Sequence, residues 1–442
     1  MKVHKWLFLS VICVLLASCA WGAFDPTASA KTFVTQLSSG DYAGAVKSFD
    51  ATMKSVMSAE KLSQTWRMLI TQAGVFQGQG DTRTAVEQGY QVVYVTCRFE
   101  KAVLDTKVVF NNANQISGLW FLPHTAAPQP PPVVKSEIKS DYYTEKEVTI
   151  DDGSPLPGTL TMPTGKGPFP AIVLVHGSGP NDRDETIGAN KPFRDLAHGL
   201  AAKGIAVLRY DKRTKVYPTQ MTNTYTVKEE VVDDTLAAVS LLRKTEGINA
   251  NRIFVLGHSL GGMVIPRIGL ADSGIAGFVI MAGATRPLGE TIIRQLNYIF
   301  SLDGKVTKEE KQKLADIKAQ VAKINSPKLA RDGGNILGAP PSYWLDLRGY
   351  NPPEAAKNIK QPMLILQGGR DYQVTTEDFS NWKNALSSRK DVTFKLYPAL
   401  NHLFIEGVGK STPDEYNKSG HVAPFVIDDI ASWIGARSLD AR

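Results

Sequence analysis

A serine between two glycines offers the clearest chemistry in this sequence of 442 residues. Ser259 is the centre of Gly-His-Ser-Leu-Gly, residues 257–261, which follows the apolar run 253–256 and precedes a helix-compatible run. This order predicts a strand, a sharp turn with the serine at its apex, and a helix. The backbone at such an apex is strained, so the residues two positions away must lack bulk, as Gly257 and Gly261 do. We therefore expect Ser259 to be a nucleophile.

A serine hydroxyl is a weak nucleophile at neutral pH and needs a neighbouring base. With a serine at such a turn, the acid and then the histidine come later in the chain. His402 satisfies this order, because it follows the predicted strand 392–397 after a short loop. His421 lies just before the last predicted helix, and we expect it at the surface or behind the site. The remaining histidines lie in N-terminal segments, precede the serine or adjoin it: His4, His124, His176, His198 and His258.

Asp371 is the best candidate for the acid that orients this base. It follows the predicted strand 363–367 across Gly-Gly-Arg, at the carboxyl end of a core strand. Active-site groups of open α/β sheets gather at that edge. Asp378 lies inside the next predicted helix and is the weaker choice. The carboxylate of Asp371 would hold His402 in the required tautomer and stabilise its imidazolium form.

A carbonyl attacked by serine becomes an oxyanion, which two preorganised backbone N–H groups must stabilise. We expect one from Leu260, directly after the nucleophile, and the other from the His-Gly-Ser-Gly-Pro turn at 176–180. The N–H of Ser178 is our first choice and that of Gly179 the second. His176 is expected to fix this loop rather than to act as a base. By composition alone this is an ordinary tight turn, but its place before the first helix of the sheet favours the oxyanion role.

Other patterns do not develop into sites. Gly-Val-Gly-Lys-Ser at 407–411 ends like a phosphate-binding loop, but Phe404 stands where the first glycine is required. The run Arg-Tyr-Asp-Lys-Arg at 209–213 lies near the expected cleft, where we favour an ion-paired loop over substrate contact. No spacing of His, Cys and Asp indicates a metal site, and we expect no cofactor. The net charge is +7, but the basic residues are scattered, so nucleic-acid binding is not expected.

Alternating strand and helix patterns from about residue 137 onward define the elements that position these residues. Residues 145–150 and 159–162 predict an antiparallel pair that opens a sheet. The later strands are continuously apolar and separated by amphipathic helices, which predicts a doubly wound, mostly parallel sheet of the α/β class, covered on both faces. We expect strands at 169–175, 205–209, 253–256, 277–281, 363–367 and 392–397, and helices at 192–203, 227–244, 377–387 and 423–434, besides the helix after Ser259.

An insertion at about 287–356 interrupts this alternation. We favour a lid that caps the active site, because aromatic residues have few other reasons to cluster there. A solvated helical bundle without a role in substrate binding is the alternative. The insertion contains a charged helix at 305–323 with an apolar stripe of Leu314, Ile317, Val321 and Ile324, and the aromatic residues Tyr343, Trp344 and Tyr350.

Residues 25–122 predict a separate small α+β domain, in which helices are followed by an antiparallel sheet. This layout resembles the nuclear-transport-factor-like cone. A proline-rich linker at 123–136 follows. Of the three cysteines, only Cys97 lies within the predicted folded part, so a buried thiol rather than a disulfide is expected. The predicted helices are 28–37, 42–49 and 59–73, and the predicted strands are 85–94, 97–107 and 108–121, the last interrupted by a turn at 111–114.

Residues 1–22 predict a targeting signal. Two lysines precede the apolar run 6–17, which is too short to span a membrane comfortably. Leu-Ala-Ser-Cys, ending at Cys19, resembles the bacterial lipobox, in which the cysteine becomes the acylated first residue. Plain cleavage after Ala20 or Gly22 is the alternative. We expect export and favour a lipid anchor through Cys19 at the cell envelope over a periplasmic or secreted form.

The turn at 257–261, Asp371, the segment Asn-His-Leu-Phe at 401–404 and the turn at 176–179 together resemble the α/β-hydrolase superfamily over roughly residues 140–440. Within it, the chain looks like bacterial secreted carboxylesterases built from a leader, a small N-terminal domain and a hydrolase core. The resemblance implies hydrolysis of a small-molecule carboxylic ester through an acyl-enzyme. It leaves the acyl and alcohol groups open.

Two other classes remain open at this stage. The same three residues serve peptidases and acyltransferases, although the insertion shows no acidic pair that could hold a substrate amine. A non-catalytic surface binding protein with this fold is the third reading, disfavoured by the intact triad and oxyanion turn. The N-terminal domain shows no catalytic constellation, and its protein partner, if it has one, is unknown from the sequence.

Overall fold

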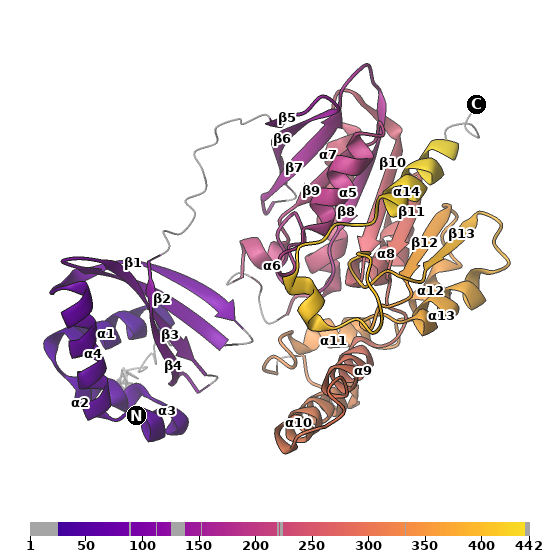
Figure 1. The fold of residues 1–442 in the computed structure, drawn as a ribbon. Helices are drawn as coiled ribbons and strands as arrows, with labels where there is room; N and C mark the ends of the chain where they lie inside the picture. Colours follow the sequence, from indigo (N-terminus) through magenta and orange to yellow (C-terminus); the bar gives the residue numbers. More distant parts are fainter. Residues whose placement is uncertain are drawn as a thin grey trace, which may run out of the picture. The chain divides into compact units, whose positions relative to one another are not determined.

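The computed structural model describes residues 25–87, 90–111, 113–124, 138–151, 153–218, 221, 224–331 and 333–437. The chain divides into two units, Met1–Gln129 and Pro130–Arg442, each with its own hydrophobic core (Figure 1). The predicted leader with Cys19 and most of the predicted linker lie outside the described residues. Within the described ranges, none of the helices has the length and apolar character needed to cross a membrane.

The N-terminal unit is a four-stranded antiparallel sheet in the order β1-β2-β3-β4 with helices packed on one face (Figure 1). Its elements are α1 (Pro26–Ser39), α2 (Tyr42–Ala45), η1 (Val46–Ser48), α3 (Ala51–Val56), α4 (Ala59–Ala73), β1 (Phe76–Glu87), β2 (Tyr90–Phe99), β3 (Val103–Phe110) and β4 (Ile116–Pro123). Asp25 and Asp50 accept hydrogen bonds from first-turn amides of α1 and α3 and so begin these helices. The ring of Trp66 lies 5.6 Å from those of Phe76 and Phe99 and joins α4 to the sheet.

The sheet of this unit corrects the prediction from sequence. It has four strands rather than three, and the predicted strand 97–107 is wrong because the chain turns where Phe99 N donates to Ala102 O. The first strand was missed because residues 77–84 are polar or glycine and show no apolar alternation. The short helix α3 was missed as well. Cys97 is a buried free thiol, as predicted, and burial raises its pKa to about 11.

The C-terminal unit is built on a nine-stranded sheet in the order β13-β12-β11-β10-β8-β9-β7-β6-β5. Strands β8 to β13 pair in parallel, and β7 pairs antiparallel with β9 and β6, as predicted for the opening pair. The strands are β5 (Ile138–Lys139), β6 (Tyr143–Ile150), β7 (Leu156–Pro163), β8 (Phe169–Val175), β9 (Ala206–Tyr210), β10 (Ile248–His258), β11 (Gly277–Met281), β12 (Met363–Gly368) and β13 (Val392–Tyr397).

The central strands show why the sheet needs helices on both sides. Every residue of β9, β11 and β12 is buried, although alternate side chains of a strand point to opposite faces. The predicted doubly wound, mostly parallel sheet is therefore confirmed (Figure 1). The covering elements are α5 (Pro192–Ala201), α6 (Arg213–Val216), η2 (Lys228–Val232), α7 (Asp233–Arg243), α8 (Leu260–Ala271), α13 (Thr376–Leu386), η3 (Pro413–Asn417) and α14 (Pro424–Ala436).

The segment between β11 and β12 contains α9 (Leu288–Phe300), α10 (Lys308–Asn325), α11 (Pro341–Leu347) and α12 (Pro352–Ala356). The helix α10 begins at a capping box of Thr307 and Glu310, three residues later than predicted. The aromatic residues of the insertion were expected to contact substrate, but the structure gives them another role. Tyr343 and Trp344 are buried in the core of the unit, and the hydroxyl of Tyr350 donates to Met263 O in α8 at 3.0 Å. Packing alone accounts for them, so they give no separate support for contact with substrate.

Candidate active site

The serine turn connects β10 directly to α8. Ser259 has φ 54° and ψ −113°, a conformation that non-glycine residues rarely adopt. Its N–H donates to Met281 O at 2.9 Å, which ties the turn to β11. A Cβ atom at Gly257 would lie 2.3 Å from Gly261 O, so the backbone of the turn folds too tightly for a side chain there. The structure thus holds Ser259 in the strained position between strand and helix that its sequence context predicts.

Asp371 and His402, 31 positions apart in the chain, form a buried pair. His402 Nδ1 lies 2.6 Å from Asp371 Oδ2, at the carboxyl ends of the neighbouring strands β12 and β13. The other carboxylate oxygen, Oδ1, accepts from the N–H groups of Gln373 and Val374 at 2.8 and 3.0 Å. Gln367 Nε2 adds a contact of 3.3 Å to Oδ2. These bonds fix the carboxylate, which in turn fixes the imidazole ring of His402.

His258, the residue before the serine, connects the serine turn to His402. Its Nε2 lies 3.0 Å from His402 O, and the two rings are 4.7 Å apart. On the other side, His258 Nδ1 forms an ion pair of 2.9 Å with Glu185 Oε2. Glu185 Oε1 accepts from Gly177 N at 2.6 Å, in the turn that we expect to bind the oxyanion. One buried pair therefore touches three parts of the site.

The ionisation of this pair follows from its mutual contact. Burial alone would raise the pKa of Glu185 and lower that of His258, but the attraction between their charges reverses both directions. The pKa of Glu185 is lowered and that of His258 is raised, so a carboxylate faces an imidazolium. Sequence reasoning missed both residues. The only local signal was an acidic residue shortly after the turn at 176–180.

The turn after β8 lies against Ser259. A Cβ atom at Gly177 would be 3.2 Å from Ser259 Cβ, and the next residues, Ser178 and Gly179, are exposed. Gly179 has φ 95°, so it occupies a backbone region that favours glycine. Leu260, at the other side of the serine, is the first residue of α8, where helical N–H groups have no intrahelical acceptor. The residues expected to bind an oxyanion thus flank Ser259 from two elements.

The remaining histidines have other contacts in the described residues. His176 Nε2 lies 3.0 Å from Asp182 O, and burial lowers the pKa of its ring to about 4, consistent with a neutral residue that fixes the loop. His198 contacts Glu145, and His421 contacts Asp195 from an exposed position. His124 belongs to the N-terminal unit and pairs with Asp105.

The run 209–213 is an ion-paired loop, the reading that we favoured. Arg209 contacts Glu145 and Asp184, Asp211 pairs with Arg183 at 3.0 Å, and Lys212 pairs with Glu230 at 2.9 Å. Arg213 contacts Asp234. These side chains are largely buried, and their ion pairs connect the loops at the carboxyl edge of the sheet.

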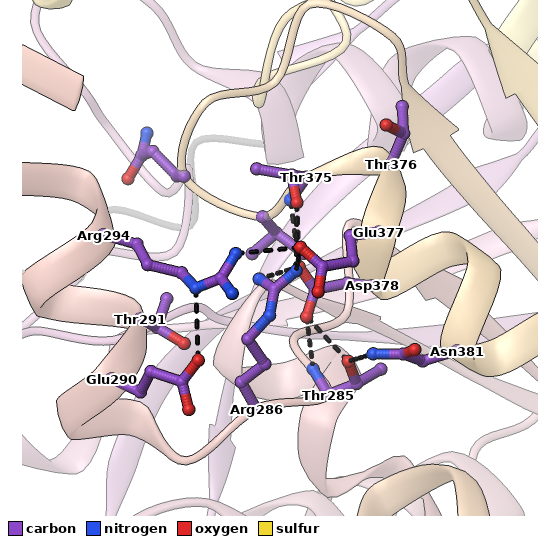
Figure 2. A network of polar contacts seen from close by, with 12 residues as sticks. Thr285, Arg286, Glu290, Thr291, Arg294, Thr375, Thr376, Glu377, Asp378 and Asn381 are labelled. Atoms are coloured by element: carbon purple, nitrogen blue, oxygen red, sulfur yellow. Dashed lines mark hydrogen bonds and ion pairs between the residues drawn. The ribbon is translucent and has the colours of Figure 1, made fainter. Parts of the chain in front are cut away.

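Asp378, the weaker candidate for the acid, belongs to a different network (Figure 2). Its carboxylate accepts from Arg286 Nη1 at 2.7 Å and from the N–H groups of Thr285 and Thr375 at 3.0 Å. Arg294 of α9 pairs with Glu377 of α13 at 2.8 Å in the same network (Figure 2). The network joins the chain after β11 and the first helix of the insertion to α13.

A second connection joins the insertion to the loop that carries Asp371. The ring of Tyr298 in α9 stacks on that of Tyr372 at 4.9 Å, and its hydroxyl donates to Ser411 O at 2.8 Å. Gln295 Nε2 donates to Gln373 O at 3.2 Å. The helix α9 therefore directly contacts the loop that carries Asp371, which we call the acid loop. Among the described residues, no group of three or more His, Cys, Asp or Glu side chains could hold a metal ion.

A doubly wound sheet with a serine on a strained strand-to-helix turn and an Asp–His pair beyond the next strands defines an α/β-hydrolase. Residues 168–407 match a family described as serine aminopeptidase S33, and residues 30–119 match one described as a protein of unknown function, DUF3887. The chain belongs to the serine aminopeptidase S33 family of α/β-hydrolases, and a DUF3887 domain precedes its hydrolase domain. It is therefore an enzyme of the hydrolase class.

Comparison with individual proteins gives a relative over nearly the whole chain. Esterase EstD of Thermotoga maritima is 39% identical over 437 residues, which cover 98% of this chain and 99% of that protein. Chlorophyllase-1 of Citrus sinensis is 26% identical over 157 residues, 33% of this chain and 45% of the relative. Among solved structures, Est1E from Butyrivibrio proteoclasticus is 17% identical with a TM-score of 0.42, covering 66% of this chain and 99% of that one.

Proposed function

We propose that the protein is a serine carboxylesterase that hydrolyses small-molecule carboxylic esters through an acyl-enzyme. The observation that carries this proposal is the buried Asp371–His402 pair of 2.6 Å, which is joined through His258 to the strained turn of Ser259. The relationship to an esterase over 99% of that protein's length supports the choice of ester substrates.

In the proposed mechanism, Ser259 Oγ attacks the ester carbonyl while His402 Nε2 removes its proton. The N–H groups of Leu260 and Ser178 bind the oxyanion, with Gly179 as the alternative to Ser178. His402 then returns the proton to the alcohol oxygen, which leaves. A water molecule, deprotonated by His402, attacks the acyl-enzyme; the bond to Ser259 Oγ then breaks, His402 returns the proton to that oxygen, and the acid is released. Asp371 stays ionised throughout and stabilises the imidazolium form of His402.

We also propose that the insertion forms one wall of the substrate site. Its helix α9 lies against the acid loop through Tyr298 and Gln295, two side chains of one helix. The stacked ring of Tyr298 and the hydrogen bond from its hydroxyl to Ser411 O hold α9 in this position. The insertion would therefore limit the acyl or alcohol group that reaches Ser259, as a lid or wall does in enzymes of this kind.

Ester hydrolysis by the purified protein and by its Ser259→Ala variant tests the proposal. With short-chain p-nitrophenyl esters, we expect the variant to lose at least about 10³-fold in kcat, because the nucleophile is gone. A fluorophosphonate probe should label the wild type and not the variant. Equal rates for the two proteins would refute the proposal, and absence of labelling in the wild type would favour a non-catalytic binding protein.

A peptidase is the second candidate, since the matched family is described as a serine aminopeptidase. It uses the same three residues, so the triad does not decide. Turnover of an ester and of an aminoacyl amide with the same acyl group separates the two activities. A kcat/KM for the amide that equals or exceeds that for the ester would replace the esterase proposal.

For the location of the protein, we propose export and attachment to the bacterial cell envelope through a lipid on Cys19. The support is the sequence of residues 1–22, with its short apolar run and lipobox-like end. A periplasmic or secreted form is the alternative. The amount of protein in the membrane fraction, with and without the cysteine, tests this.

A further inference from the structure

Lys212 is one of the most deeply buried side chains of the hydrolase unit, with 2% of its surface exposed. It lies two residues beyond the end of β9. Its ammonium Nζ donates to Gly177 O at 2.8 Å and pairs with Glu230 Oε1 at 2.9 Å. A buried ammonium destabilises a protein unless it is paired and hydrogen-bonded, so these two contacts define where the charge must lie.

The carbonyl that Lys212 binds belongs to the turn over the nucleophile. Asn181 Nδ2 donates to the same oxygen, Gly177 O, at 3.2 Å and to Ser178 O at 3.2 Å. Lys212 N donates in turn to Asn181 O at 3.0 Å, so the loops after β8 and β9 are hydrogen-bonded to each other. On the other side, Gly177 N donates to Glu185. The peptide groups before and after Gly177 are therefore both fixed by buried charged side chains.

The direction of one N–H group follows from this arrangement. Gly177 O and the N–H of Ser178 belong to the same peptide group, which is planar and trans, so they point in opposite directions. Because Gly177 O points at Lys212 and Asn181, the N–H of Ser178 points away from both. Gly177 itself lies against the nucleophile, since a Cβ atom there would be 3.2 Å from Ser259 Cβ.

We propose that Lys212, together with Asn181, is a positioning residue of the oxyanion hole that acts through Gly177 O on the N–H of Ser178. The inference rests on the proposed function, in which this N–H binds the oxyanion. The cation also draws electron density from the peptide group, which strengthens its N–H as a donor. Its effect belongs to the transition state, because only there does the substrate oxygen carry the developing negative charge.

Glu230 keeps the ammonium in place and is itself enclosed by the insertion. It lies in the π-helical turn η2 and is 5% exposed. The ring of Tyr225 packs edge-on against that of Tyr343 in α11 at 5.7 Å. Burial and then the charge of Glu230 raise the pKa of Tyr343 well above its ordinary range. Lys212 and Glu230 thus form a pair shielded from solvent.

The double variant Lys212→Met/Glu230→Gln tests the inference, because it removes both charges and leaves neither unpaired. We expect kcat for a soluble ester to fall about 10- to 100-fold, somewhat less than when an oxyanion donor is deleted outright. KM should change by less than about threefold. The inhibition constant of an aryl trifluoromethyl ketone, which forms an oxyanion on Ser259, should rise by the same factor as kcat falls.

The variant Arg243→Met/Asp272→Asn is the matched control. It removes an ion pair of 2.8 Å in the same unit that has no contact with Gly177 among the described residues, and it should leave kcat and ketone affinity unchanged. A folded Lys212 double variant with wild-type kcat and ketone affinity would overturn the inference.

If that variant does not fold, Asn181→Ala decides, since it removes the other donor to Gly177 O without touching a buried charge. Unchanged kcat in Asn181→Ala would then overturn it. Failure of the wild type to turn over any ester would instead refute the proposed function.

Discussion

At the scale of single residues, His258 shows how the neighbour of the proposed nucleophile, Ser259, can connect several parts of the site. Its side chain lies between Glu185 and the backbone of His402, and it directly precedes Ser259 in the chain. Through its ion pair with Glu185, the His258 ring connects the turn at 176–180, the serine turn and the loop that carries His402. Removing one partner would leave the other charge buried and unpaired, which is costly.

The pair predicts how stability depends on pH. Glu185 has a lowered pKa, so its contribution is present above its unfolded value and is lost as pH falls through the folded one. His258 has a raised pKa, so its contribution is present below its unfolded value and is lost as pH rises through the folded one. The stabilisation is therefore largest between the unfolded pKa of Glu185, 4.5, and that of His258, 6.5, and it declines on either side toward the folded values.

We expect His258→Gln to lower the free energy of unfolding by about 3–5 kcal/mol near neutral pH, because Glu185 is left without its counter-charge. The double variant Glu185→Gln/His258→Gln should lose less. The thermal midpoint of the hydrolase unit, measured from about pH 6 to about pH 9, should fall for the wild type relative to the double variant as His258 loses its proton. Parallel curves for the two proteins over that range would contradict a charged pair.

The residues that sequence reasoning could find are those with a local signal. Ser259 has its flanking glycines, and Asp371 and His402 each follow a predicted strand after a short loop. Glu185 and Lys212 have no such signal, because their charged partners, His258 and Glu230, come from other segments of the chain. His258 and His402 are 144 positions apart and meet only because the sheet places the ends of β10 and β13 at one edge.

At the scale of elements, the network around Asp378 joins the start of the insertion to α13 (Figure 2). Asp378 is 1% exposed and binds Arg286, which is 7% exposed, before α9 begins. Arg294 adds a contact from α9 to Glu377, which is exposed and contributes little by itself. The buried contact should therefore carry most of the stabilisation.

We expect Asp378→Asn to destabilise the hydrolase unit by up to about 3–5 kcal/mol, because Arg286 loses its buried counter-charge. Amide hydrogen exchange in α9 should become faster, while kcat should fall by less than about tenfold since Asp371 and His402 are untouched. Asp316→Asn in the exposed part of α10 is the control and should change neither quantity. Unaltered exchange in α9 of the Asp378 variant would show that this network does not hold the insertion.

The elements themselves could be predicted to different degrees. Strands β8, β11 and β13 begin and end at the predicted residues, because each is a continuous or bounded apolar run. β1 could not be predicted, since it is polar and depends on pairing with β2. The sequence located the aromatic residues of the insertion but did not show what they contact. A sequence shows that Tyr343 and Trp344 are aromatic, but it does not show whether the protein core or a substrate covers them.

At the scale of the whole molecule, all residues of the proposed mechanism lie in the C-terminal unit, which has its own sheet and core. The N-terminal unit has a separate core and contributes no residue to that mechanism. The chemistry is therefore confined to one unit. Attachment to the cell envelope would depend on the leader alone, so the two properties should be separable.

We expect Cys19→Ser to move the protein from the membrane fraction to the soluble fraction of cells, because no acylated cysteine can then form. Within the described residues no helix could replace the anchor. The kcat/KM of the released protein for a soluble ester should stay within about twofold of the wild type, since Ser259 and its partners are unchanged. Ser18→Ala, which keeps the cysteine beside a small residue, is the control and should remain in the membrane fraction. A wild-type protein that is already soluble would establish plain cleavage after Ala20 or Gly22 instead, and would leave the proposed ester chemistry intact.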